Sequence, residues 1–264
     1  MSDASLWLRG MDAVRFARTQ LGFEPDLKQA AVLRANARQG ILNCSRQWGK
    51  STVTAAMAVH RAFADPETLV LVLSPSERQS GEFLRKSASF VRKLGLPVRG
   101  DGDNDVSLML PNQSRIVGLP GKEKTVRGFS KVSLLLIDEA SRVEDDLYDA
   151  VRPMLAVSDG DLWLMSTPFG RRGFFYETWV NGDPDWLRIE VPVTDCPRIK
   201  PSFLKRMKKG MSERKFRQDF LCEFVGDDDS LFDEELIRSL IREDIPNYMQ
   251  EFGSELAWRP VAKG

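Results

Sequence analysis

The residues best suited to chemistry lie in one short run that ends in Gly-Lys-Ser-Thr: Cys44, Ser45, Arg46, Gln47, Trp48, Gly49, Lys50, Ser51 and Thr52. A nucleoside triphosphate needs backbone N–H groups at the start of a helix, a lysine for the outer phosphates and a hydroxyl for Mg²⁺. An apolar run at 40–43 precedes these residues and a helical pattern at 53–63 follows them, as such a loop requires. We therefore predict that the whole run binds a nucleotide, with Lys50 catalytic and Ser51 a ligand of Mg²⁺.

One departure from the usual pattern lies at the start of this run. The first glycine of the GxxxxGK pattern falls on Cys44, so the backbone there must adopt a conformation that a side chain tolerates. The sequence therefore does not determine the conformation of the loop at Cys44, whereas Lys50 and Ser51 match the pattern.

A second apolar run, 132–137, leads into two carboxylates, Asp138 and Glu139. Such a run is typical of a strand buried on both faces of a parallel sheet, and these sheets bind ligands at the carboxyl ends of their strands. We predict that Asp138 serves Mg²⁺ and that Glu139 orients or deprotonates the attacking water, so the expected activity is ATP hydrolysis. The alternative is that both carboxylates only begin the helix that follows.

Three further polar residues are candidates for contact with the nucleotide. Ser166 and Thr167 end an apolar run at 162–165, where they would sense the terminal phosphate or merely form a turn before Pro168. Gln29 lies in the first turns of a helix that begins at Pro25 and Asp26. Its amide has the donor and the acceptor that the edge of adenine needs, although a solvated helix residue is an equal alternative.

Two arginines and one basic segment are candidates for contact with phosphates. Arg46, inside the loop, and Arg127, in the segment TVRGFS, compete for the role of a finger that stabilises charge on the transferred phosphate, in this chain's own site or in a neighbour's. The segment 200–217 has eight Lys or Arg and one acid. Within it we select Lys205, Arg206, Lys208 and Lys209 as candidates for binding the DNA backbone, against the alternative of a solvated face.

Composition limits the remaining function classes. The formal net charge is zero, so there is no global basic field and any contact with DNA must be local. Three cysteines without paired spacing and a single histidine argue against a disulfide framework and a zinc site, and favour a reducing cytoplasm. The sequence contains no apolar stretch of membrane-spanning length and no signal peptide, so we expect no membrane association.

The order of the patterns predicts an α/β fold. Apolar runs at 41–43, 69–73, 114–119, 132–137, 162–165 and 187–193 alternate with helical patterns, as in a mostly parallel central sheet flanked by helices. Turn residues at 111–114 predict a hairpin within 106–119. We expect one domain over 1–226, and then an acidic linker or tail over 227–264.

Five segments together resemble a known family. In this order they are SRQWGKST, RGFS, LLLIDEAS, MSTPFGRRGFFYETW and FLCEFVGDDDSLF, and over about residues 20–232 the chain resembles the ATPase domain of the large terminase subunit of tailed bacteriophages. The resemblance implies an ASCE-type, RecA-like P-loop fold that uses ATP with Mg²⁺, has Arg46 beside the phosphates, and has Ser166 and Thr167 as its coupling motif. It further implies a ring of copies on the portal protein, monomers in isolation, and a small terminase subunit that delivers viral double-stranded DNA to a prohead in the bacterial cytoplasm.

Two rival functions and one expected absence follow. A helicase-like, DNA-stimulated ATPase of superfamily 2 shares the nucleotide motifs but needs a second RecA-like domain. A binding module for nucleic acid or portal, with a vestigial nucleotide pocket, has only Cys44 in its favour. Large terminases usually continue into an RNase H-like nuclease of very roughly 150 residues or more. We expect no nuclease activity in this chain, which is either an isolated ATPase domain or the product of a split gene.

Overall fold

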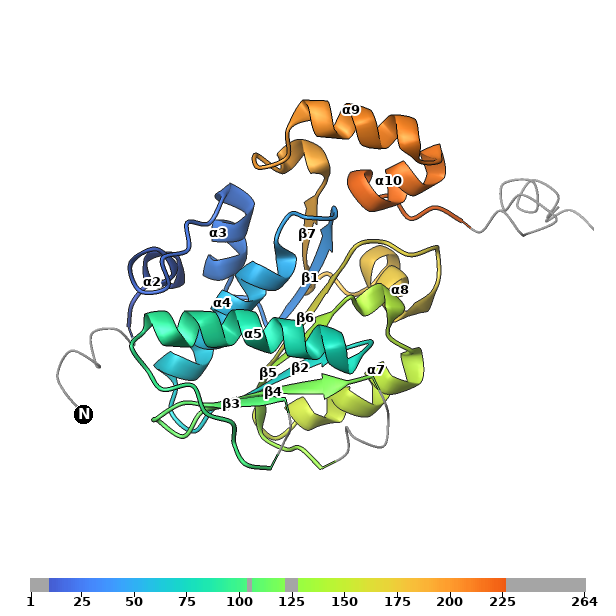
Figure 1. The fold of residues 1–264 in the computed structure, drawn as a ribbon. Coiled ribbons are helices and arrows are strands. Elements are labelled where there is room, and N and C mark those ends of the chain that lie inside the picture. Colours follow the sequence, from blue (N-terminus) through green and yellow to red (C-terminus); the bar gives the residue numbers. More distant parts are fainter. Residues whose placement is uncertain (1–9, 104–105, 122–127, 227–264) are drawn as a thin grey trace, which may run out of the picture. The chain divides into compact units, whose positions relative to one another are not determined.

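The fold is built on one sheet whose strands are almost all parallel (Figure 1). The computed structural model describes residues 10–103, 106–121 and 128–226, and within them seven strands lie in the order β3-β4-β2-β5-β6-β1-β7. Of these strands, only β3 and β4 pair antiparallel, which confirms the predicted hairpin. The strands are β1 (Gln39–Cys44), β2 (Leu69–Ser74), β3 (Ser107–Met109), β4 (Arg115–Pro120), β5 (Val132–Asp138), β6 (Asp161–Ser166) and β7 (Leu187–Val191). The predicted class, an α/β P-loop fold with a mostly parallel sheet, is confirmed.

Helices cover both faces of this sheet. They are α2 (Ala13–Thr19), α3 (Leu27–Arg34), α4 (Lys50–Ala64), α5 (Glu77–Lys93), α7 (Asp145–Val151), α8 (Gly173–Asn181), α9 (Pro201–Gly210) and α10 (Glu213–Leu221), with short 3-10 turns η1 (Ala140–Arg142), η2 (Arg152–Leu155) and η3 (Val193–Asp195). Alternate strand residues point to opposite faces. Leu134 and Leu136 belong to the core that also contains buried residues of α2 to α5, whereas Leu135 and Ile137 belong to the core that contains buried residues of α7 and α8. This two-sided burial explains why the central strands are uninterrupted apolar runs.

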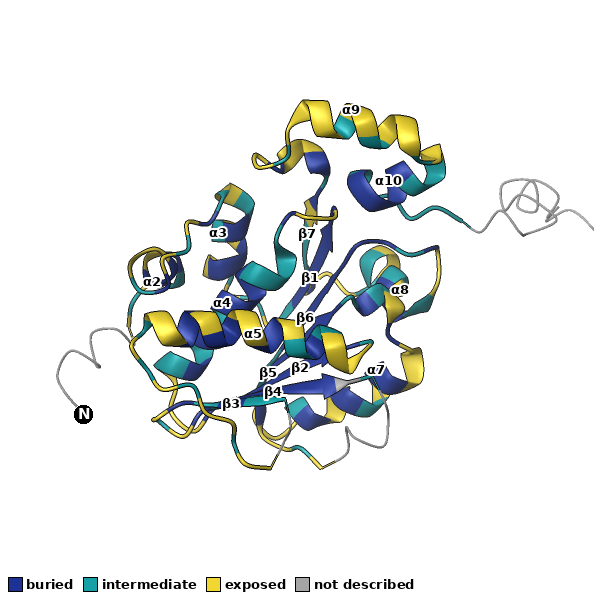
Figure 2. Ribbon diagram, in the orientation of Figure 1, coloured by how far each residue is buried: buried dark blue, intermediate teal, exposed yellow. Residues whose placement is uncertain are grey.

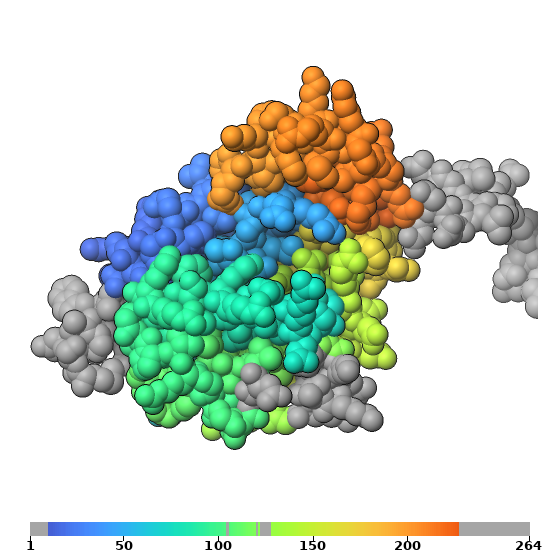
Figure 3. Space-filling model, viewed as in Figure 1, coloured from blue at the N-terminus to red at the C-terminus, as the bar shows by residue number. Residues whose placement is uncertain are grey.

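The last two helices form a small unit with its own core, here called the α9–α10 unit (residues 201–221). Its core is formed by Phe216 and Phe220 of α10 together with Val193 of η3, and no residue of α9 itself is buried. Figure 2 shows α9 as an almost continuously exposed helix. In the space-filling view the unit (orange) lies directly against the blue segment that contains β1 and the start of α4 (Figure 3).

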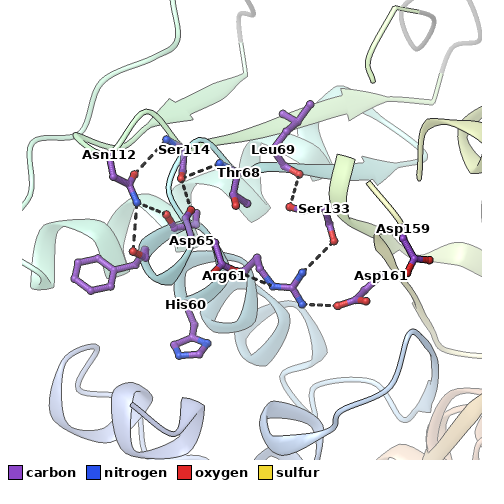
Figure 4. Close-up of polar contacts among 12 residues, drawn as sticks. His60, Arg61, Asp65, Thr68, Leu69, Asn112, Ser114, Ser133, Asp159 and Asp161 are labelled. Atoms are coloured by element: carbon purple, nitrogen blue, oxygen red, sulfur yellow. Dashed lines mark hydrogen bonds and ion pairs between the residues drawn. The ribbon is translucent and has the colours of Figure 1, made fainter. Parts of the chain in front are cut away.

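A polar network at the amino ends of the strands holds the far end of α4 (Figure 4). Arg61 donates to the Ser133 carbonyl (3.0 Å) and pairs with Asp161, so α4 is bonded to β5 and β6. The Asn112 amide donates to the Ala62 carbonyl (2.8 Å), which otherwise has no helical partner at this terminus. Because α4 is fixed here, the residues at its other end, Lys50 and Ser51, are held in place relative to the sheet.

The structure corrects one predicted element and leaves one boundary untested. The strand predicted at 187–193 ends at Val191, because Pro192 has no N–H for the ladder and 193–195 form η3. The predicted tail, 227–264, lies outside the described residues, so the domain boundary stays a prediction. Within the described ranges, no helix has the length and apolar character needed to cross a membrane.

Candidate functional site

The predicted phosphate loop connects β1 to α4 at the carboxyl edge of the sheet. Gly49 takes a left-handed conformation (φ 97°) immediately before the helix, which begins at Lys50 with no side-chain cap. Its first N–H groups therefore face the loop, as an anion site requires. Cys44 is the last residue of β1 and is not among the described residues with positive φ. An extended backbone accepts any side chain, which explains why this loop does not need glycine at that position.

The predicted carboxylates meet the loop residues directly. The Ser51 hydroxyl donates to Asp138 Oδ2 (2.9 Å), and Lys50 Nζ lies 2.7 Å from Glu139 Oε1. Burial raises the pKa of Asp138 although Lys50 opposes the shift. Burial disfavours the charged form of Lys50, but Glu139 and Asp138 outweigh this effect and the pKa of Lys50 is raised. The site therefore contains a lysine held positive between two carboxylates.

The capping alternative for the two carboxylates does not fit the geometry. Glu139 itself precedes η1 in a left-handed conformation (φ 54°) and makes no side-chain cap. Among the described residues, Asp138 Oδ1 accepts from the Glu139 N–H (3.0 Å) and not from a helix terminus. A non-glycine residue at positive φ stores strain of about 1–3 kcal/mol. Here the strained turn aims the Glu139 carboxylate at Lys50.

The candidate sensor residues are bonded to the turn that carries Glu139. The Ser141 hydroxyl lies 2.7 Å from Ser166 Oγ and donates to the Thr167 carbonyl (2.8 Å). Thr167 Oγ1 is buried and has no hydrogen-bond partner among the described residues. Sequence reasoning missed Ser141, although its place two residues after Glu139 was an available signal. β5 and β6 are neighbours in the sheet, so this link follows from the topology.

Gln29 lies against the phosphate loop and is buried, so it is not a solvated helix residue. Its amide nitrogen donates to the Trp48 carbonyl (3.1 Å), and its amide oxygen accepts from the Asp26 N–H (3.1 Å). The second bond completes the capping box of α3. Gln29 therefore lies beside the loop with its amide oriented by protein contacts, and its expected contact with adenine stays a prediction.

The two candidate arginine fingers have different outcomes. Arg46 contacts α10: its Nε lies 3.0 Å from Asp219 Oδ2, and its N–H donates to the Asp219 carbonyl (2.8 Å). Arg127 lies outside the described residues. Sequence reasoning missed both Asp219 and Arg198, whose guanidinium donates to the Trp48 carbonyl. No local signal marks either residue, because the contacts join segments far apart in the chain.

The basic candidates lie together on α9. Lys205, Arg206, Lys208 and Lys209 are all exposed. Lys208 lies over the Phe216 ring of α10, with its Nζ 5.8 Å from the ring centroid. These cations are separated in sequence from the phosphate site but belong to the same unit as Asp219.

The donor set fits Mg²⁺. Magnesium prefers oxygen ligands and usually keeps several waters beside one or two protein oxygens and the phosphates. The hydroxyl of Ser51 and the carboxylate of Asp138 lie side by side at the start of α4. The two residues would therefore hold a magnesium ion that also binds the phosphates of a nucleotide.

Comparisons with known proteins agree with this geometry. A family model described as terminase large subunit, T4likevirus-type, N-terminal, matches residues 41–239. The large terminase subunit of Thermus virus P23-45 is 25% identical over 248 residues, covering 80% of this chain and 51% of that protein. The one of Escherichia phage T5 is 24% identical over 224 residues, covering 81% and 51%. The chain thus spans about half the length of the curated relatives it matches.

Solved structures show the same fold. The ATPase domain of the Thermus phage P74-26 large terminase has a TM-score of 0.71 at 22% identity, covering 80% of this chain and 98% of that one. The large terminase of bacteriophage HK97 has a TM-score of 0.67 at 17% identity, covering 80% and 54%. Since the family model spans most of the sequence, the chain belongs to the terminase large subunit family, in its T4-like N-terminal type.

Proposed function

We propose that this chain hydrolyses ATP and that the hydrolysis powers the movement of viral double-stranded DNA into a prohead. The observation that carries the proposal is the joint placement of Lys50, Ser51, Asp138 and Glu139 at one edge of the sheet. Family membership supports it, as do relatives with nucleotides: structures of the large terminase of a thermophilic bacteriophage are complexes with ADP and with ATP-gamma-S. ATP is accordingly the proposed substrate.

Each residue of the site has a distinct role in hydrolysis. Lys50 exchanges the Glu139 carboxylate for the outer phosphate oxygens, which frees Glu139 to orient and deprotonate the attacking water. Ser51 and Asp138 hold Mg²⁺. When bound, the ion neutralises charge that develops on the phosphates. The backbone N–H groups of the loop and of the first turn of α4 bind the remaining phosphate oxygens.

Coupling to movement runs through two contacts of this site. Ser166 and Thr167 respond to the terminal phosphate through Ser141, which follows Glu139 in the same turn. Arg46 joins the loop to the α9–α10 unit through Asp219. Either Arg46 or Arg127 completes the charge around the phosphate, Arg127 acting from a neighbouring copy in an assembled ring. The proposed partners are DNA, the portal protein and the small terminase subunit, in the bacterial cytoplasm.

The basic face of α9 is the proposed contact for the DNA backbone. Lys205 and Lys209 lie one helical turn apart on this exposed helix. Replacing both by alanine should weaken DNA binding and make the slope of log affinity against log salt shallower by about 0.9 for each phosphate that the variant no longer neutralises. The matched control replaces Arg15 and Arg18, two exposed cations of α2. Equal effects in the two variants would contradict a specific role of α9.

One assay separates the proposed function from its rivals. ATP turnover is measured with and without double-stranded DNA, beside a nuclease assay on the same protein. A packaging ATPase turns over ATP, and the nuclease assay measures separately whether the chain cleaves DNA. Absence of turnover would favour the binding module with a vestigial pocket, and strand separation driven by ATP would favour the helicase-like alternative. Replacing Arg127 by alanine should lower turnover of assembled copies but leave the ATP affinity of the monomer nearly intact.

A further inference from the structure

The connector between β7 and α9, residues 192–200, touches the phosphate loop at both ends of that loop. At the start of the loop, the Ser45 hydroxyl lies 3.2 Å from Cys196 Sγ of the connector, and the Ser45 N–H donates to the carbonyl of Val191, the last residue of β7 (2.9 Å). Near its end, the Arg198 guanidinium donates to the Trp48 carbonyl and lies 3.0 Å from Asp26 Oδ2. The connector therefore spans the whole loop and reaches the peptide bond between Trp48 and Gly49.

The Trp48 carbonyl accepts from two side chains at once. Arg198 and Gln29 both donate to it, and they come from the connector and from α3 respectively. Asp26 holds the two donors together, because its Oδ1 accepts from the Gln29 N–H (2.8 Å) and its Oδ2 lies beside Arg198. This group of contacts fixes the direction of one loop carbonyl.

Fixing that carbonyl also fixes an N–H. In a trans peptide the C=O and N–H point in opposite directions, so a Trp48 carbonyl held by Arg198 and Gln29 directs the Gly49 N–H away from these two side chains. Backbone N–H groups of such loops cradle the inner phosphates of a nucleotide. Gly49 is needed at this point, because its φ is 97° and a Cβ would lie 3.1 Å from Gln29 Nε2. Arg198 and Gln29 therefore control the orientation of the Gly49 N–H.

We propose that Arg198 is a positioning residue of the nucleotide site, which holds the Trp48–Gly49 peptide with its N–H directed at the phosphates. The proposal rests on the proposed binding of a nucleotide by this loop. It predicts that Arg198 contributes to the affinity of every nucleotide with an inner pair of phosphates, whatever its base. It also predicts little effect on the chemical step, since Arg198 contacts neither Glu139 nor Lys50 among the described contacts.

The test compares Arg198→Met, Arg198→Lys and a control in the full chain. Dissociation constants for ADP, GDP and ATP-gamma-S are measured by calorimetry, and kcat for ATP is measured at saturation. For Arg198→Met we expect all three nucleotides to bind about tenfold more weakly, which corresponds to about 1.4 kcal/mol, with kcat within twofold of the unmodified chain. Arg198→Lys should recover part of the affinity, because an ammonium keeps the charge and the donors but lacks the fixed planar geometry of the guanidinium, whose Nη2 makes both contacts.

Lys28→Met is the matched control. Lys28 also joins α3 to this part of the chain, through Asp195 Oδ2 (3.6 Å) and the Glu190 carbonyl (3.3 Å), but neither of these partners belongs to the phosphate loop. The two cations are similarly exposed, at 44% for Lys28 and 46% for Arg198. We expect nucleotide affinity within twofold of the unmodified chain.

Three results would overturn the assignment of Arg198. The first is unchanged nucleotide affinity in Arg198→Met. The second is an equal loss of nucleotide affinity in Lys28→Met, which would indicate that both residues only dock the connector. The third is a changed ratio of ADP to GDP affinity in Arg198→Met, which would place Arg198 at the base. An unmodified chain that binds no nucleotide at all would instead refute the proposed function together with this role.

Discussion

Replacing Glu139 by glutamine removes one charge from the site and leaves the side chain the same size. Glu139 Oε1 lies 2.7 Å from Lys50 Nζ, and both side chains are largely shielded from solvent, at 24% and 12% exposure. At an effective dielectric constant of about 20, unit charges at this distance attract by about 6 kcal/mol. Desolvation offsets most of this, so the net value of such a contact is about 1.5–3 kcal/mol. ATP must displace this contact to reach Lys50.

Glu139→Gln should therefore separate binding from hydrolysis. The amide holds Lys50 less strongly, so we expect ATP to bind with unchanged affinity or up to about tenfold more tightly, a gain of about 1.4 kcal/mol. Glutamine cannot accept the proton of the attacking water, and loss of a general base typically lowers turnover by about 10² to 10⁴-fold. The two effects have opposite signs, which distinguishes them from a general loss of structure.

The assay measures steady-state ATP turnover and, by calorimetry, the dissociation constant of ATP in the slow variant. The matched control is Glu144→Gln, an exposed carboxylate that precedes α7 and makes no side-chain cap. It should change neither quantity by more than twofold. Unchanged turnover in Glu139→Gln would refute the assignment of the base. Affinity for ATP weakened beyond about tenfold would show that Glu139 supports binding and does not compete for Lys50.

Three further predictions concern pH and the α9–α10 unit. His60 is the single histidine of the sequence, and burial lowers its pKa below 6.5, so the folded chain favours the neutral form. Urea titrations should therefore show the free energy of unfolding falling as the pH drops below about 6.5, and His60→Gln should remove that slope. Burial raises the pKa of Asp138 above 3.8. Because Mg²⁺ binds the carboxylate form, acidification should weaken Mg²⁺ binding at a higher pH than it would with an ordinary aspartate. Calorimetric Mg²⁺ affinity that stays constant down to about pH 4 would contradict this. Asp219→Asn replaces the buried carboxylate that pairs with Arg46 and should lower the free energy of unfolding by about 1–3 kcal/mol. Glu223→Gln removes the charge from an exposed pair with Arg217 and should lower it by less than about 1 kcal/mol. Equal shifts of the urea midpoint in the two variants would refute the distinction.

The groups that bind phosphate and metal were predictable because their signals are local. Gly49, Lys50 and Ser51 follow an apolar strand and begin a helix, and Asp138 follows a second strand, so residue type and neighbouring pattern located each of them. The order of strands in a parallel sheet then brings both motifs to one edge.

The supports of the loop were not predictable on the same basis. Arg198 lies 150 residues beyond Trp48, and its role depends on where the connector passes after β7. An arginine in an irregular segment between a strand and a helix gives no periodic signal. Asp219 likewise resembles an ordinary helix residue in the sequence, and its burial arises only because α10 packs back onto the loop. The inward-facing side of α10 is a property of the tertiary arrangement.

The position of β1 in the sheet sets an order of events during synthesis. β1 pairs only with β6 and β7 among the described strands, although it is the first of them to be made. At about 5–20 residues per second, the ribosome reaches β6 roughly 10 s after it has passed β1. β2 pairs with both β4 and β5, and these three strands can assemble in that interval. The phosphate loop therefore gains a rigid base late in synthesis. Nascent chains released before Asp161 should fail to bind to an ADP resin, whereas chains released after residue 226 should bind to it.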